Sequence, residues 1–147
     1  MQFIANEKVN KINALLNDLD AIYHQASRKL GISDSTLIVL YEIYINNGCC
    51  PLSAIIKNNG LSKQTANSAV RKLEAEGILR LEPYKGKAKL LRLTKKGSEY
   101  AEVTAGRVFA AECSVFAGWT EEEINNCLAL LEKFNVSLRK EIEQINT

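Results

Sequence analysis

The chain has 147 residues, of which 46% are apolar and 24% charged, and its formal net charge is +2. This composition is typical of soluble globular proteins, so it excludes disordered and fibrous chains, and the length suits one hydrophobic core. Because no apolar run approaches 18 residues and no secretory signal pattern opens the sequence, we expect one cytoplasmic domain over residues 1–147, without a membrane partner.

Charge is distributed unevenly along the chain. Residues 62–97 include ten basic and three acidic residues, a net charge of +7, whereas the remainder has nine basic and fourteen acidic residues, a net charge of −5. A basic segment in an otherwise acidic protein is expected where one surface meets a polyanion such as nucleic acid. The segment is therefore the first place to look for a binding surface.

Two amphipathic helices are predicted in the first third of the chain. From Glu7 to Leu30, apolar residues recur at steps of three and four, which gives a long helix one apolar face, and Gly31 ends it. A second helix, capped by Asp34 or Ser35, ends at residues 46–48, which read Asn-Asn-Gly.

The next segment predicts a helix-turn-helix. Pro51 to Asn59 is interpreted as a short third helix that Gly60 closes. Ser62 then caps a fourth helix from Lys63 to Glu76, and Gly77 stops it. This arrangement presents the second of its two helices to the major groove of DNA.

A β-hairpin and two more helices complete the predicted order. Ile78–Glu82 and Lys89–Leu93 alternate apolar and polar residues on either side of a linker with Pro and Gly, which predicts a wing. Thr94 caps a fifth helix that extends to about Ala117, and Thr120 opens a sixth. We therefore expect a mainly α fold with a small β-hairpin wing, namely a dimeric winged helix-turn-helix with six helices.

Dimerisation is predicted from the two ends of the chain. The first helix and the sixth, whose heptad rhythm is interrupted at Asn135, carry apolar stripes longer than a small central unit can cover. Pairing of two copies would bury both stripes. The alternative is that the first, fifth and sixth helices pack on one another within a monomer.

The predicted fourth helix and the wing offer side chains suited to DNA. No acidic residue lies between Gly60 and Leu73, whereas an ordinary solvated helix face mixes both charge signs. Amide side chains there suit adenine, and arginine suits guanine or phosphate. We expect DNA contacts from Ser62, Lys63, Gln64, Thr65, Asn67, Ser68, Arg71 and Lys72, and from Lys85, Lys87 and Lys89, which alternate on one side of the hairpin.

Residues 61–97, LSKQTANSAVRKLEAEGILRLEPYKGKAKLLRLTKKG, resemble the recognition helix and wing of the MarR family of transcriptional regulators. The more specific parts are LSKQT, KLEAEGIL and LTKKG, and the order of six helices extends the resemblance along the chain. The resemblance implies a homodimer held by residues 7–32 and 98–147 and a DNA-binding lobe at 33–97. It also implies binding to a pseudo-palindromic operator, usually as a repressor that a small ligand or an oxidant releases.

The wing departs from the family pattern. Family members commonly carry Asp and, two residues later, Arg near the wing tip, where this chain has Lys85 and Lys87. Lysine does not reproduce the planar, forked donor set of arginine. We therefore expect the wing lysines to contact phosphates rather than to read sequence.

A small-molecule effector is a further expectation of the resemblance, which implies a pocket between the terminal helices and the DNA-binding lobe. Four residues are candidates to line it: Tyr23, His24, Tyr41 and Tyr44. Aromatic residues at these helical spacings are also ordinary core residues.

Other classes of function find less support. There is a single histidine and no phosphate-binding loop, GxSxG or HExxH motif, so we expect no enzyme, no metal site and no cofactor. Two alternatives remain open. The first is a thiol-based redox-sensing regulator, although no basic residue adjoins Cys49, Cys50, Cys113 or Cys127 in sequence. The second is a winged-helix module that binds proteins without DNA specificity.

Overall fold

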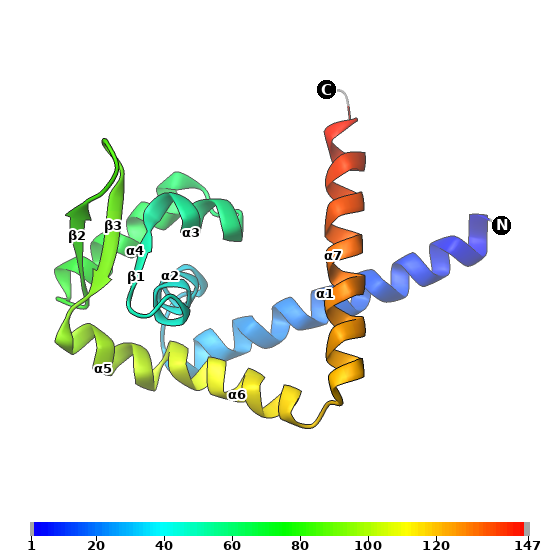
Figure 1. The fold of residues 1–147 in the computed structure, drawn as a ribbon, viewed down its shortest axis with the longest axis horizontal. Helices are drawn as coiled ribbons and strands as arrows, with labels where there is room; N and C mark the ends of the chain where they lie inside the picture. The colour runs from blue at the N-terminus through cyan, green and yellow to red at the C-terminus, as the bar shows by residue number, and fades with distance from the viewer. Residues whose placement is uncertain (1, 146–147) are drawn as a thin grey trace. The chain divides into compact units, whose positions relative to one another are not determined.

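A computed structural model describes the backbone of residues 2–145 and the side chains of residues 6–145. Within that range lie seven helices and one three-stranded antiparallel sheet (Figure 1). The described residues form two compact units that divide after Phe109. The assignment of residues 1–147 to one domain stays a prediction, and residues 1, 146 and 147 lie outside the description.

The first two helices agree with the predicted pattern, with one correction at a cap. Helix α1 (Gln2–Leu30) starts five residues before the predicted Glu7 and ends at Gly31, whose φ of 69° is left-handed. Helix α2 (Asp34–Ile45) is capped by Ser33 rather than by Asp34 or Ser35. The extended backbone at Ser33 lets its hydroxyl accept the amide hydrogen of Thr36 at 3.1 Å, so Asp34 becomes the first helical residue.

The predicted helix-turn-helix is confirmed. Helix α3 (Leu52–Asn59) ends at Gly60, which has a φ of 60°, and helix α4 (Lys63–Ala75) begins after Ser62. The prediction placed Pro51 within the first of these helices, but Pro51 instead ends a strand and precedes the helix.

The wing belongs to a sheet with one strand more than predicted. Strands β2 (Leu79–Pro83) and β3 (Lys89–Leu93) form the expected hairpin, and β1 (Cys49–Pro51) pairs with the other side of β3, giving the order β1-β3-β2. In this register Arg92 of β3 lies opposite both Cys49 and Arg80. A three-residue strand is too short to show an alternating pattern, so β1 left no clear signal in the sequence.

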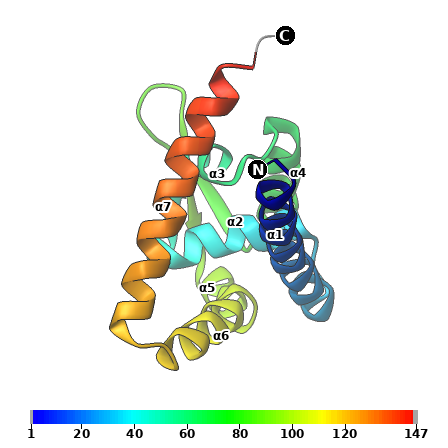
Figure 2. The ribbon, with the colours of Figure 1, turned by 90° about the vertical axis from the view of Figure 1, so that its right-hand side faces the viewer.

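One core holds this part of the molecule together. Leu40 and Ile43 of α2 are fully buried with Ile55 of α3, Leu73 of α4 and Leu91 of β3. We call residues 34–103, which contain α2 to α4, the sheet and the following helix α5 (Lys95–Val103), the winged lobe. Residues 6–25 of α1 are exposed where this helix leaves the lobe, and the β2–β3 loop projects from it (Figure 2).

The predicted fifth helix is two helices, which corrects the expected number from six to seven. α5 ends at Thr104, and α6 (Ala105–Ala117) follows. The Thr104 hydroxyl donates to the carbonyl oxygen of Tyr100 at 2.7 Å, and the backbone at Thr104 leaves the helical region. A hydroxyl that competes for a helical carbonyl favours such a bend.

The second unit consists of the end of α6 and helix α7 (Glu121–Glu143). The predicted capping box is confirmed, because Thr120 accepts the amide hydrogen of Glu123 and the Glu123 carboxylate accepts that of Thr120. Phe116 and Trp119 contact each other edge to face, with ring centres 5.1 Å apart. No residue of α7 within the described range is buried.

Candidate nucleic-acid interface

Helix α4 is amphipathic in a way that leaves its polar side chains free of the core. Ala66, Ala69, Val70 and Leu73 are buried, and they fix the inner face of the helix. On the other side Lys63, Gln64, Ser68, Arg71 and Lys72 are exposed, and Asn67 is half-buried. The structure therefore brings the predicted helix residues together on one solvent-facing surface.

Two of the predicted contact residues also form the cap of this helix. Ser62 Oγ accepts the amide hydrogen of Thr65 at 3.0 Å and donates to Thr65 Oγ1 at 2.8 Å. Satisfying the amide of Thr65 in this way leaves fewer free donors at the helix N-terminus. Both residues are exposed, so the cap fixes an end of α4 that is open to solvent.

The wing tip carries the three predicted lysines, with one correction to their placement. Lys85 and Lys87 lie in the turn between the strands, and only Lys89 belongs to β3, so the three do not alternate along one strand as predicted. Gly86, with a φ of 62°, turns the chain between the first two. All three side chains are exposed, and the Lys85 ammonium lies 5.6 Å from the centre of the Tyr84 ring.

An ion cluster between the two strands of the wing was not predicted. Glu82 accepts hydrogen bonds from Nε of Arg92, at 3.0 Å to each carboxylate oxygen, and from Nε of Arg80 at 2.9 Å. The Arg92 hydrogen bond is the main reason that the pKa of Glu82 lies below its usual range, and Arg80 adds to the effect. The cluster connects both strands of the wing and leaves one net positive charge. We call these three residues the wing brace.

The closing LTKKG run fixes α5 against the end of α4. Thr94 Oγ1 donates to the carbonyl oxygen of Gly77 at 2.6 Å, and Lys96 Nζ donates to that of Glu76 at 2.7 Å. Gly97 is buried, and a Cβ atom there would overlap the carbonyl oxygen of Ile78. These contacts explain why the LTKKG residues occur at this point of the chain. They hold the start of β2 and the end of β3 to the C-terminus of α4.

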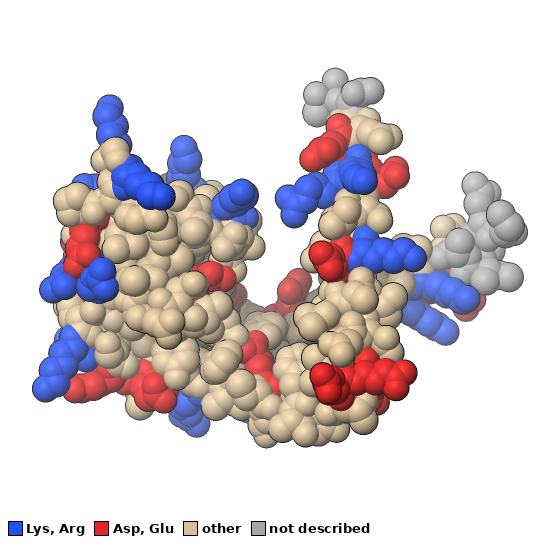
Figure 3. Space-filling model, viewed as in Figure 1, with Lys and Arg blue, Asp and Glu red and all other residues tan. Residues whose placement is uncertain are grey.

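Basic side chains of the winged lobe lie on the same surfaces as the predicted DNA contacts. Figure 3 shows Lys and Arg side chains over the wing tip and α3, along the upper edge of the lobe in that view, without acidic side chains between them. Among the described residues of α3 and the first three turns of α4 there is no Asp or Glu. This edge suits a polyanion.

The four predicted ligand residues lie on two helices, two on α1 and two on α2. Tyr23 and His24 are exposed on α1. His24 Nδ1 lies 2.8 Å from Oδ2 of Asp34, the first residue of α2. Tyr41 and Tyr44 are half-buried on α2 and contact Phe109 edge to face, with ring centres 6.4 and 6.1 Å apart. Only Tyr44 of the four lines the cavity described next.

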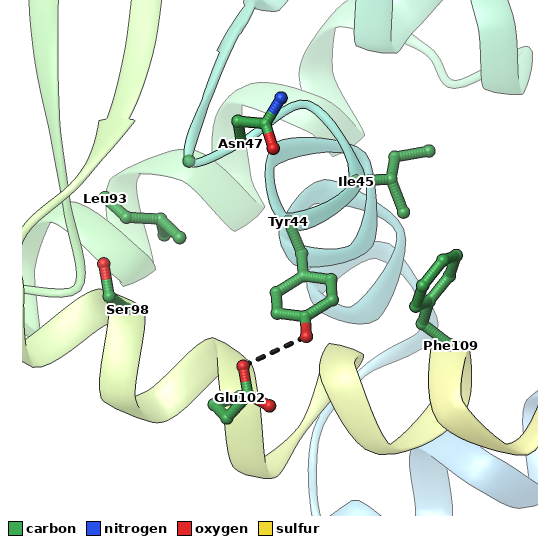
Figure 4. A pocket seen from close by; sticks show the side chains of 8 residues that line it. Tyr44, Ile45, Asn47, Leu93, Ser98, Glu102 and Phe109 are labelled. Carbon is green, nitrogen blue, oxygen red and sulfur yellow. Dashed lines mark hydrogen bonds between the residues drawn. The ribbon is translucent and has the colours of Figure 1, made fainter.

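A cavity of about 560 Å³ lies between α2 and α5 (Figure 4). Tyr44 and Glu102 both line it, and the Tyr44 hydroxyl donates to Oε2 of Glu102 at 3.0 Å. The other side chains come from the end of α2 and the turn after it, from the end of β3, and from α5 and α6: Ile45, Asn47, Leu93, Ser98 and Phe109. We call this the α2–α5 cavity.

The residues that sequence reasoning missed share a cause. Ser98 and Glu102 are four apart on a helix and so share a face, but nothing local shows that Tyr44 lies opposite them. Arg80 and Glu82 are two apart on a strand and so also share a face, and a correct hairpin register would have placed Arg92 beside them.

Among residues 2–145, no helix is both long enough and apolar enough to cross a membrane. Within the described residues, no three His, Cys, Asp or Glu side chains gather where they could hold a metal ion.

The fold and its exposed basic surface define a winged helix-turn-helix protein. Residues 30–88 match the model of the MarR family, and solved MarR family structures share the fold of nearly the whole chain, so the resemblance indicated by the sequence is confirmed. A comparison with curated proteins finds no match.

Three solved structures show the extent of the likeness. A MarR family regulator from Neisseria meningitidis is 19% identical, with a TM-score of 0.82 over 93% of this chain and 97% of that one. A MarR family regulator from Listeria monocytogenes, solved with a 26-mer DNA, is 23% identical, with a TM-score of 0.70 over 95% of each chain. Staphylococcus aureus MarR, solved with salicylate and kanamycin, is 19% identical, with a TM-score of 0.69 over 95% of each chain.

Proposed function

We propose that this protein is a sequence-specific, DNA-binding transcriptional regulator. The observation that carries the proposal is the exposed face of α4, which has no acidic residue in its first three turns and lies in the same lobe as a wing with three exposed lysines. Gln64 and Asn67 suit adenine edges, Arg71 suits guanine, and the wing lysines suit phosphates on either side. The DNA complex of the Listeria monocytogenes regulator supports this use of the fold.

We propose that the active form is a homodimer that binds a pseudo-palindromic site. In the first unit the apolar stripe of α1 is exposed, with Val9, Ile12 and Leu19 each about half accessible. In the second unit α7 spans 23 residues without a buried one. Apolar faces of this length are stable in water only when covered, and a second copy of the same chain would cover both.

Regulation by a small molecule belongs to the same proposal, with repression as its mode. The α2–α5 cavity adjoins the last residue of β3 and the turn before β1, so an occupant would contact the base of the wing. The ligand complex of Staphylococcus aureus MarR supports a role for small molecules on this fold. A ligand that binds more tightly to one wing position than to another would favour that position. The resulting change in DNA affinity is limited by the ligand's difference in affinity for the two wing positions.

The proposal is tested by selecting bound fragments from a library of genomic DNA at about 0.15 M salt. We expect a recovered motif with two inverted half-sites, because two-fold protein symmetry requires the inversion, spaced by about one DNA turn of roughly ten base pairs or a multiple of it. Arg71→Ala should lose preference for this motif while it retains weak binding to other duplexes. Fragments without a shared motif would leave only a non-specific binding protein.

One observation favours a second candidate, a thiol-based redox-sensing regulator. Cys49 is half-buried and lies opposite Arg92 in the β1–β3 register, so an oxidant could reach a thiol that lies on the strand next to the wing. Treatment with hydrogen peroxide should then lower DNA affinity in the wild type but not in Cys49→Ser. Equal sensitivity of both proteins would remove this candidate.

A further inference from the structure

The α2–α5 cavity has a one-sided electrostatic character. Glu102 is the one carboxylate among its described lining residues, and no Lys, Arg or His contributes to that lining. Ser98 and Asn47 add neutral polar groups, while Leu93 and Ile45 add apolar surface. An anionic ligand would therefore meet a negative charge without a compensating cation, whereas a cation would find a partner.

Aromatic rings stand beside that carboxylate. Tyr44 and Phe109 line the cavity and contact each other edge to face, and Tyr41 contacts the same Phe109 ring from α2. The faces of aromatic rings carry partial negative charge, and they attract ammonium and guanidinium groups within about 6 Å. Glu102 and the two lining rings therefore favour the same sign of charge on a ligand.

The arrangement is already formed without a ligand. The ring of Tyr44 packs on the backbone at Gly106, where an added Cβ would lie 3.0 Å from ring and hydroxyl atoms. The hydroxyl of Tyr44 donates to Oε2 of Glu102, which orients the carboxylate and leaves its Oε1 atom as an acceptor (Figure 4). A site whose groups are positioned in advance loses less conformational entropy on binding.

We propose that the α2–α5 cavity binds a small organic cation, an ammonium or guanidinium group on an apolar body. The cation would donate to Glu102 and lie against the rings of Tyr44 and Phe109, with its apolar part toward Leu93 and Ile45. This ligand class deepens the proposed function, since it names what the regulator responds to. Binding itself requires no DNA, so it is tested separately.

The test uses three probes of similar size that differ in charge: benzylammonium, benzyl alcohol and benzoate. Each is titrated into the full chain without DNA, and the aromatic proton NMR signals of Tyr44 and Phe109 are followed. We expect saturable shifts with benzylammonium, with an affinity at least about tenfold above that of benzoate, since an ion pair and a cation–π contact act together. The neutral alcohol should lie between them.

Glu102→Gln isolates the contribution of charge, because its amide oxygen still accepts the Tyr44 hydrogen bond. This variant should bind benzylammonium about tenfold more weakly than the wild type does, with an affinity close to that for benzyl alcohol. Glu99→Gln is the matched control, since Glu99 is an exposed residue of the same helix that does not line the cavity. It changes the net charge equally and should leave the affinity unchanged.

Three results would overturn the proposal: benzoate binding as well as benzylammonium, no saturable shift with benzylammonium, or equal weakening by the two glutamine variants. If Glu102→Gln does not fold, Phe109→Leu provides the second test, because it keeps the carboxylate and removes one ring. It should still weaken benzylammonium more than benzyl alcohol, and an equal effect on both probes would contradict the proposal. None of these results depends on whether the protein binds DNA.

Discussion

Arg92 on β3 places its Nε atom 3.0 Å from each carboxylate oxygen of Glu82 on β2, so the two strands of the wing are joined by an ion pair. Arg80 adds a second donor from β2. The wing tip has Lys85 and Lys87 where the resembled family has an acid and a base. The wing tip therefore lacks the ion pair that family members have there. We interpret the wing brace as the group of residues that positions the tip instead.

Glu82→Gln should lower DNA affinity about three- to tenfold. Without the brace the wing is mobile in the free protein, and ordering it on DNA costs conformational entropy that lowers the affinity. Charge alone predicts the opposite, since removing a carboxylate near DNA strengthens binding. The direction of the change therefore separates the two effects in a fluorescence anisotropy titration. Amide hydrogen exchange in residues 84–88 should also become faster, and unchanged exchange with tighter binding would contradict the role of the brace.

Gly97→Ala should destabilise the protein by about 1–3 kcal/mol, because the added methyl group overlaps the carbonyl oxygen of Ile78 and must displace backbone. Gly118→Ala is the matched control: its new Cβ would lie 3.4 Å from the nearest atom, the carbonyl oxygen of Val115, which is ordinary contact. Urea unfolding followed by circular dichroism measures both variants. Equal stability of the two would show that the α4–α5 junction is looser than described.

Stability should fall in acid partly through Asp34. Hydrogen bonds from Ser27 first, and from His24 second, hold the pKa of the Asp34 carboxyl below its usual value. A depressed pKa in the folded state stabilises the protein above the unfolded pKa of about 3.9, and this contribution disappears as the pH falls through the folded pKa. Asp34→Asn should therefore be less stable than the wild type at pH 7 and approach it near pH 3 in urea unfolding. A constant difference at both pH values would mean that the charge of Asp34 is not the cause.

Leu131→Glu should shift the protein from dimer to monomer at micromolar concentration, because a charge would then have to be buried between apolar faces. Leu131 is 49% exposed and belongs to the α7 stripe. Asn126→Glu, on the opposite side of α7, adds the same charge and should remain dimeric. Sedimentation velocity distinguishes the two states, and a monomeric wild type would remove the homodimer from the proposed function.

Elements with local signals were predictable from the sequence. Ser62 and Thr94 cap helices as expected, because a hydroxyl just before an amphipathic run can accept a free amide hydrogen of the first helical turn. Gly31, Gly60 and Gly77 end helices in the left-handed region, where glycine has no steric cost.

Features that depend on tertiary contacts were not predictable in the same way. The break at Thr104 follows from a hydroxyl bond to Tyr100 that a helical pattern does not reveal. The bond from Tyr44 to Glu102 joins residues 58 positions apart. Pairing of Arg92 with Glu82 depended on the hairpin register, and for that reason the brace was missed although each residue lay in a predicted strand.

The central claim is that α4 reads DNA sequence while the wing contacts phosphates. Its most direct test is the dissociation constant for the selected motif and for random duplex, measured over a range of salt with the wild type, Arg71→Ala and Lys87→Ala. We expect wild-type affinity to fall steeply with salt, Arg71→Ala to lose about 1–3 kcal/mol on the motif alone, and Lys87→Ala to weaken both duplexes alike with a shallower salt slope. Affinity that does not depend on salt, or an equal loss on both duplexes for Arg71→Ala, would contradict the account.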